Sequence, residues 1–129
     1  MKAVADEWSG VHCGETEYED ISWSDLQKLI NRLDARKYTM VIISPGEDNN
    51  LTIGGGGGQY VVVATTNGDR FFEVSRDLPG EKSTVLLNVG GQEGDYPAEM
   101  IVDEVTATAC AMTYLRSGTM DDRFTWREM

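Results

Sequence analysis

The sequence predicts an α+β fold in which an antiparallel meander sheet carries two helices on one face. Two amphipathic segments begin at helix-capping residues, one at about residues 22–36 and one at about residues 103–117. Between them, short runs rich in Val, Ile, Thr, Tyr and Phe alternate with Gly, Pro and Asn turns. The turns are too short to hold crossover helices, so we expect antiparallel neighbours.

The first helix is expected to begin at Ser22, a good N-cap, with Asp25 at the third helical position. An apolar stripe at helical spacing follows: Leu26, Leu29, Ile30 and Leu33. Arg36 and Lys37 suit the C-terminal end of this helix, because cations are favoured there.

Residues 4–8 are expected to form a first strand, and residues 9–20 a loop in which acids crowd together. Five strand-like runs follow, at residues 38–44, 51–53, 60–66, 70–75 and 84–89. Asn67-Gly68-Asp69 predicts a hairpin between two of them. Residues 99–102 are expected to form a last short strand.

The second helix is expected to start at the N-cap Asp103 and to stop at Gly118. Its predicted buried stripe is Val105, Ala109, Met112 and Leu115. The tail after residue 120 contains Phe124 and Trp126, which we expect to fold back onto the core.

The 129 residues fit one domain, residues 1–129, and 40% of them are apolar, enough for a core without disulfides. The net charge of −11 argues against direct binding of nucleic acid or an anionic membrane. It favours a basic partner, unless the charge serves only solubility. No apolar run has the length of a membrane span, and the start does not resemble a signal peptide. With Cys13 and Cys110 97 residues apart and no disulfide framework, we expect a cytoplasmic protein.

Glycines 54–58 invite a phosphate-loop interpretation, and a nucleotide or small-ligand module is the alternative from another functional class. Such a loop needs a nearby base and a helix directly after it, whereas Gln59 begins a strand-like run here. A hairpin loop, or a place where another backbone comes close, is the structural interpretation.

No set of residues indicates catalysis. His12 is the one histidine, and it adjoins Cys13, whereas catalytic Cys–His pairs come from separate parts of a chain. The carboxylate pairs are more typical of a solvated acidic surface. We therefore expect no enzyme, no metal site and no cofactor.

Acidic side chains beside aromatic residues are the candidate binding features. Glu93, Asp95 and Tyr96 form the first candidate group, placed in a loop bounded by Gly and Pro between strand and helix, and Glu47 and Asp48 form the second. Ordinary solvated loops explain either cluster equally well, and Tyr96, which precedes Pro97, fits an inward-packed turn residue as well as an anchor.

Three segments resemble one known family. The first begins with Leu51-Thr52-Ile53, continues through the glycine run and ends with Gln59-Tyr60-Val61-Val62. The second is residues 89–98, with the sequence VGGQEGDYPA. The third runs from residues 114–118 through Phe124-Thr125-Trp126. In this order they are similar to the first-numbered family of immunity proteins in bacterial polymorphic toxin systems. The similarity runs from about residue 40 onward.

The resemblance implies a cytoplasmic antitoxin that binds a cognate protein toxin and covers its active site. It implies that the toxin is often a nucleic-acid deaminase, with a nuclease or another toxin activity as the alternative. It does not imply which residues touch the toxin, because immunity surfaces vary with their partners.

Overall fold

The computed structural model describes residues 1–78 and 83–129. The elements are β1 (Lys2–Ser9), β2 (His12–Tyr18), α1 (Trp23–Asn31), β3 (Met40–Ser44), β4 (Asn50–Gly56), β5 (Gln59–Thr66), β6 (Arg70–Val74), β7 (Thr84–Val89), β8 (Gln92–Pro97), the 3-10 helix η1 (Ala98–Met100), α2 (Glu104–Ser117) and β9 (Trp126–Glu128).

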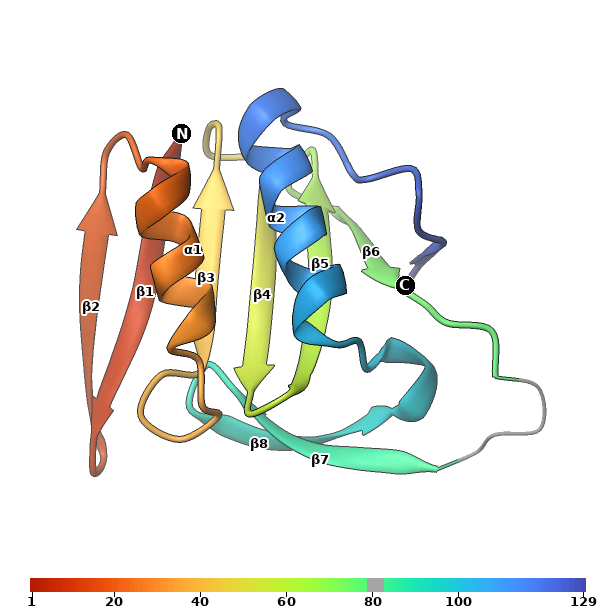
Figure 1. Cartoon of the computed structure of the whole chain (residues 1–129), viewed down its shortest axis with the longest axis horizontal. Coiled ribbons are helices and arrows are strands. Elements are labelled where there is room, and N and C mark those ends of the chain that lie inside the picture. The colour runs from red at the N-terminus through yellow and green to blue at the C-terminus, as the bar shows by residue number, and fades with distance from the viewer. Residues whose placement is uncertain (79–82) are drawn as a thin grey trace.

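Within the described residues, seven strands form an antiparallel sheet in the order β2-β1-β3-β4-β5-β6-β9. Both helices lie on one face of this sheet, and the separate hairpin β7–β8 crosses one end of it (Figure 1). The opposite face of the seven-stranded sheet is called the helix-free face below. The predicted α+β class and the meander from β3 to β6 are confirmed.

Alternation along the strands decides which side chains meet the helices. The main core is built from alternate sheet residues and from one side of each helix: Ala3, Ala5, Val41, Ile43, Leu51, Ile53, Val62 and Ala64 with Leu26, Leu29, Ile30, Ala107, Cys110, Ala111 and Tyr114. Each fully buried Leu, Ile or Val side chain stabilises the fold by about 1.5–3 kcal/mol relative to exposure. A second cluster of Val61, Leu87, Met100 and Ile101 holds β7–β8 against the end of the sheet.

The first helix is shorter than predicted. Ser22 caps it, since its Oγ accepts the Asp25 N–H at 3.1 Å, but α1 ends at Asn31 rather than near residue 36. The Asp34 carboxylate accepts the N–H groups of residues 36, 37 and 38 at 2.9–3.0 Å, which turns the chain away from the helix axis. Arg36 and Lys37 therefore lie in the connection to β3.

The second helix has the predicted ends but not the predicted buried face. Asp103 accepts the Thr106 N–H at 2.9 Å, and Gly118 closes the helix in the left-handed conformation. The buried residues are Ala107, Cys110, Ala111 and Tyr114, whereas Val105 is 78% exposed. Apolar residues occupy most of the circumference of α2, so its sequence pattern does not single out the face that is buried. The small Ala107 and Ala111 let this side of the helix approach the sheet closely.

Three expected segments differ in the structure. Residues 9–20 are not a loop, because β2 occupies most of them and pairs with β1 around the Gly10-Val11 turn. Residues 92–97 are not a loop either, because β8 pairs with β7. Residues 99–102 form η1 and a single bridge from Val102 to Tyr60 rather than a strand. The tail does fold back, with β9 paired to β6.

Candidate functional site

The glycine run closes a hairpin and receives neighbouring segments. Residues 54–56 are buried in β4, and Gly57 and Gly58 form the two-residue turn to β5, both with positive φ. A Cβ at each buried glycine would overlap another part of the chain: Val89 at Gly54, Leu87 at Gly55, and the backbone of Leu33 and Asp34 at Gly56. The close approach of other segments, which was the structural interpretation, is confirmed.

The backbone of this run is also engaged. The Gly55 N–H donates to the Thr39 carbonyl at 2.9 Å, and the Gly57 N–H donates to the Leu33 carbonyl at 3.3 Å. Arg76 lies beside Gly58, but its guanidinium donates to the Ala98 carbonyl at 3.1 Å. These N–H groups do not point together at a vacant position, as a phosphate would require.

The reactive side chains lie apart. His12 and Cys13 are exposed neighbours on β2, where successive side chains point to opposite faces. Cys110 lies in the main core, and burial raises the pKa of its thiol to about 12. Both cysteines are free, and the described residues contain no group of three His, Cys, Asp or Glu side chains suited to a metal ion.

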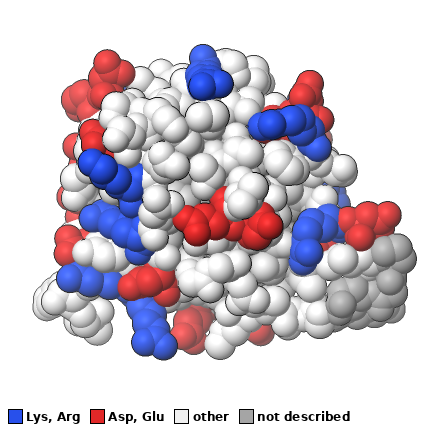
Figure 2. All heavy atoms as spheres, viewed as in Figure 1, with Lys and Arg blue, Asp and Glu red and all other residues white. Residues whose placement is uncertain are grey.

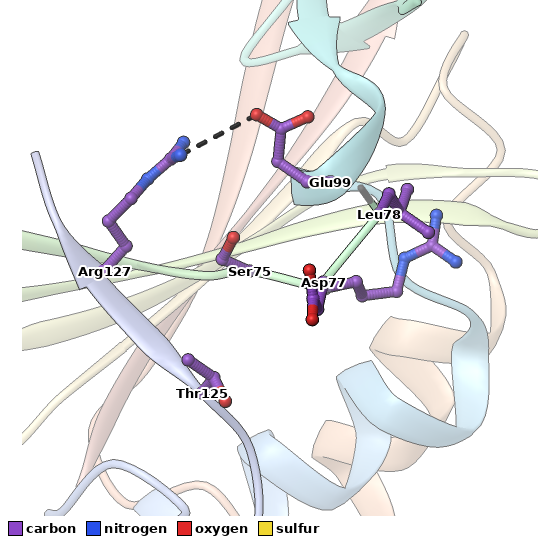
Figure 3. A pocket seen from close by; sticks show the side chains of 7 residues that line it. Ser75, Asp77, Leu78, Glu99, Thr125 and Arg127 are labelled. Carbon is purple, nitrogen blue, oxygen red and sulfur yellow. Dashed lines mark ion pairs between the residues drawn. The ribbon is translucent and has the colours of Figure 1, made fainter. Parts of the chain in front are cut away.

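A hollow of about 370 Å³ lies where β6 ends and β9 begins (Figure 3). Two of its charged lining residues pair with each other, since Arg127 contacts Glu99 at 3.7 Å and also forms an ion pair with the buried Glu73, and the Arg76 guanidinium donates to the Ala98 carbonyl. Ser75 and Thr125 contribute hydroxyl groups to the lining. The one histidine of the chain, His12, lies on β2 at the other edge of the sheet, so no imidazole can activate these hydroxyls.

The predicted binding residues lie at two separate places. Glu47 and Asp48 are exposed in the turn before β4, whereas Glu93 and Asp95 are exposed on β8, which packs at the other end of β4. The seven residues of β4 separate the two groups by roughly 20 Å at about 3.3 Å per residue. The structure therefore does not join them in one loop cluster.

Tyr96 differs from its two acidic neighbours. Glu93 and Asp95 share the outer side of the β7–β8 hairpin with Leu86, which is 61% exposed. Tyr96 lies on the inner side and is partly buried against the second cluster. Its side chain packs inward, as expected from the interpretation of Tyr96 as an inward-packed residue rather than an anchor.

A buried carboxylate fixes the tip of the β7–β8 hairpin. Asp6 is 4% exposed and accepts the N–H groups of Thr39 and Met40 at 2.7 and 3.0 Å, the Trp8 indole N–H at 2.8 Å and the Thr39 hydroxyl. The Thr39 oxygen in turn accepts the Gly91 N–H at 3.1 Å. The sequence pattern gives no sign of this network, because Thr39 and Met40 lie more than 30 positions after Asp6, and Gly91 lies more than 50 after Thr39.

Comparison with protein families decides the assignment. The profile of the family described as immunity protein Imm1 matches residues 14–128, nearly the whole chain. This chain is an Imm1 immunity protein. A comparison with curated proteins gave no match. Across the described residues, neither helix has the length and hydrophobicity needed to span a bilayer.

In this Imm1 protein, the segments that carry the family resemblance build the fold. In the first segment, Gly54 leaves room for the side chain of Val89, which begins the second segment. Gly91, in that second segment, lies against the Trp8 ring. Trp126, in the third, packs against the main core and donates its indole N–H to the Asp121 carbonyl at 2.9 Å.

Proposed function

We propose that this immunity protein binds a cognate toxin in the cytoplasm of the producing cell and inhibits it by covering its active site. The toxin in this proposal is a cytidine deaminase that acts on DNA or RNA. The family match over residues 14–128 carries the proposal. The protein acts by binding, without catalysis or a cofactor of its own.

The charge of the protein supports a nucleic-acid-acting target. An enzyme that binds phosphate backbones needs Lys and Arg to displace counterions. A protein with a net charge of −11 would be steered toward such a basic surface and would compete there with nucleic acid. The exposed acids Glu47, Asp48, Glu93 and Asp95 are proposed to take part in this contact.

Co-expression in bacteria tests the function. The toxin encoded beside the gene for this chain is induced with or without the immunity protein, and the genome is scored for C-to-T changes and for strand breaks. We expect toxin alone to raise the frequency of C-to-T changes and the immunity protein to restore the background level. A catalytically inactive toxin serves as the control.

Two outcomes contradict this proposal at different levels. Strand breaks without base changes, suppressed by the immunity protein, would identify a nuclease target and remove the deaminase. Toxicity that is equal with and without the expressed immunity protein would remove the function itself.

A further inference from the structure

The helix-free face carries a continuous row of side chains across the sheet. Strand register aligns one residue from each strand, in the order Glu17, Val4, Ile42, Thr52, Val63, Glu73 and Arg127. The centre of the row is apolar or uncharged, and its four central side chains are partly exposed. The next row brings Phe71, which is 43% exposed, to the same face beside Thr65. We call the uncharged positions Val4, Ile42, Thr52 and Val63, together with Thr65 and Phe71, the floor.

Of the residues that the structure describes, the hairpin β7–β8 covers one end of this face. Val89 packs over Gly54, and Leu87 packs with Val61. At the other end, a hollow of about 240 Å³ opens between β1, β3 and the turn before β4, lined by Lys2, Ile42, Ser44, Gly46, Glu47 and Asn50. The floor therefore lies between the hairpin and the Glu47 turn.

Exposed acids border the floor on three sides. Glu15 and Glu17 share the helix-free face of the edge strand β2, Glu47 and Asp48 lie in the turn before β4, and Glu93 and Asp95 lie on the outer side of β8. On the fourth side, the charges are engaged in ion pairs: Arg127 pairs with Glu73 and Glu99, and Arg70 pairs with Glu128. These three acidic groups are called the rim below.

The helix side has a different charge pattern. α1 carries Lys28 in its last turn and Arg32 as its C-cap, and Figure 2 shows Lys and Arg side chains gathered along the part of this side where α1 lies. An apolar groove of about 490 Å³ runs between α1 and α2, lined in part by Trp23, Val105 and Met112. Its lining also includes one acid, Glu104, but exposed acids border the floor on three sides, so this groove is the weaker candidate for a basic partner.

We propose that the toxin docks on the helix-free face, with an apolar patch of the toxin on the floor and its Lys and Arg side chains against the rim. This proposal rests on the proposed function. A buried apolar centre inside a polar border is the usual arrangement of a protein interface. A second copy of the chain is a poorer occupant, because two proteins of net charge −11 would place like charges against each other.

Matched charge variants test the docking face. The two rim variants are Glu15→Lys with Glu17→Lys, and Glu93→Lys with Asp95→Lys; Thr52→Lys changes the centre of the floor. The helix-side controls are Asp25→Lys with Glu104→Lys, which make the same change in net charge, and Thr108→Lys in the α1–α2 groove. Binding to the inactive toxin domain is measured at low and at physiological ionic strength, and circular dichroism and thermal unfolding verify the fold of each variant.

We expect each rim variant to slow association by at least about tenfold at low ionic strength, with a smaller effect at physiological salt. We expect Thr52→Lys to raise the Kd at least about tenfold, mainly through faster dissociation. The helix-side variants should stay within about twofold of the wild type.

Three results overturn the docking face. They are wild-type affinity in all three face variants, equal losses on the two sides of the protein, and loss only in the helix-side variants. Because the rim positions are exposed, these variants keep the test valid even if Thr52→Lys unfolds. A wild-type protein that does not bind the toxin at all would instead overturn the proposed function.

Discussion

Asp121 is a buried carboxylate whose negative charge is stabilised by hydrogen bonds from its neighbours. It is 2% exposed and accepts hydrogen bonds from the Arg123 backbone and guanidinium and from the Thr113 hydroxyl, at 2.6–3.2 Å. The hydrogen bonds from the Arg123 guanidinium are the main cause that lowers the pKa of this carboxyl from 3.8 to about 2. The Asp121 backbone carbonyl also receives the Trp126 indole N–H, so this residue ties the tail to α2.

The lowered pKa predicts how stability depends on pH. A carboxyl with a lower pKa in the folded state stabilises the protein above its unfolded pKa of 3.8, and this contribution is lost as the pH falls toward 2. We expect Asp121→Asn to lower the free energy of unfolding near neutral pH by on the order of 2 kcal/mol. Urea unfolding from pH 7 to pH 2 should show the gap between the two proteins closing below about pH 4. A gap that does not change with pH would mean that Asp121 acts through packing alone.

The structural role of a single residue was predictable from the sequence where its hydrogen-bond partner is close along the chain. Ser22 and Asp103 follow the N-cap rule, in which a side-chain oxygen meets an N–H three residues later, and Gly118 supplies the left-handed conformation that ends α2. Asp6 was not predictable in the same way. Its partners Thr39 and Met40 reach it only through the pairing of β1 with β3.

Among the elements, the sequence predicted well those with a clear apolar pattern. β3, β5, β6 and β7 appear where runs rich in Val, Ile and Phe predicted them. β2 escaped prediction because it is an edge strand, exposed from His12 to Glu17, and so has no apolar alternation. The face of α2 was mispredicted for the opposite reason, since apolar side chains lie on nearly all of its sides.

The two glycines at the tip of β7–β8 have separable roles. Both have positive φ, 66° at Gly90 and 81° at Gly91, which disfavours any other residue. A Cβ at Gly91 would in addition overlap the Trp8 ring, whereas a Cβ at Gly90 would make an ordinary contact with Met40 at 3.6 Å. Gly90→Ala is therefore a matched control for the backbone strain at Gly91.

We expect Gly90→Ala to destabilise the protein by about 1–2 kcal/mol through backbone strain alone. Gly91→Ala should cost a further 1–3 kcal/mol or so, because the Trp8 indole must move away from Asp6. Urea unfolding followed by tryptophan fluorescence measures both values. Equal losses in the two variants would show that contact with Trp8 does not fix the hairpin tip.

For the whole molecule, the α+β class and the immunity family were accessible from the sequence, and the arrangement of the candidate interface was not. Glu47, Asp48, Glu93 and Asp95 stood out by charge, but only the strand register reveals an uncharged floor between the two groups. Glu15 and Glu17 join them because β2 folds back beside β1. Tyr96, for which the sequence left an aromatic anchor and an inward-packed residue open, turns inward for the same reason that places Glu93 and Asp95 outside, namely alternation along β8.

The net charge of −11 has a specific role in the proposed complex. It would steer a basic toxin toward the protein, and the rim acids would then orient the encounter on the helix-free face. Nucleic acid would compete for the same basic surface of the toxin, because both ligands present negative charge to it. We therefore expect the immunity protein to cover the active site and, by the same contact, to compete with the nucleic-acid substrate.

The most direct test of the account is a titration of the purified toxin domain with this protein while cytidine deamination of a nucleic-acid substrate is followed. We predict that at low substrate concentration activity falls to zero at about one equivalent of immunity protein, and that at high substrate concentration more than one equivalent is needed for the same inhibition. Residual deamination in a saturated complex, or inhibition that does not depend on substrate concentration, would contradict occlusion of the active site.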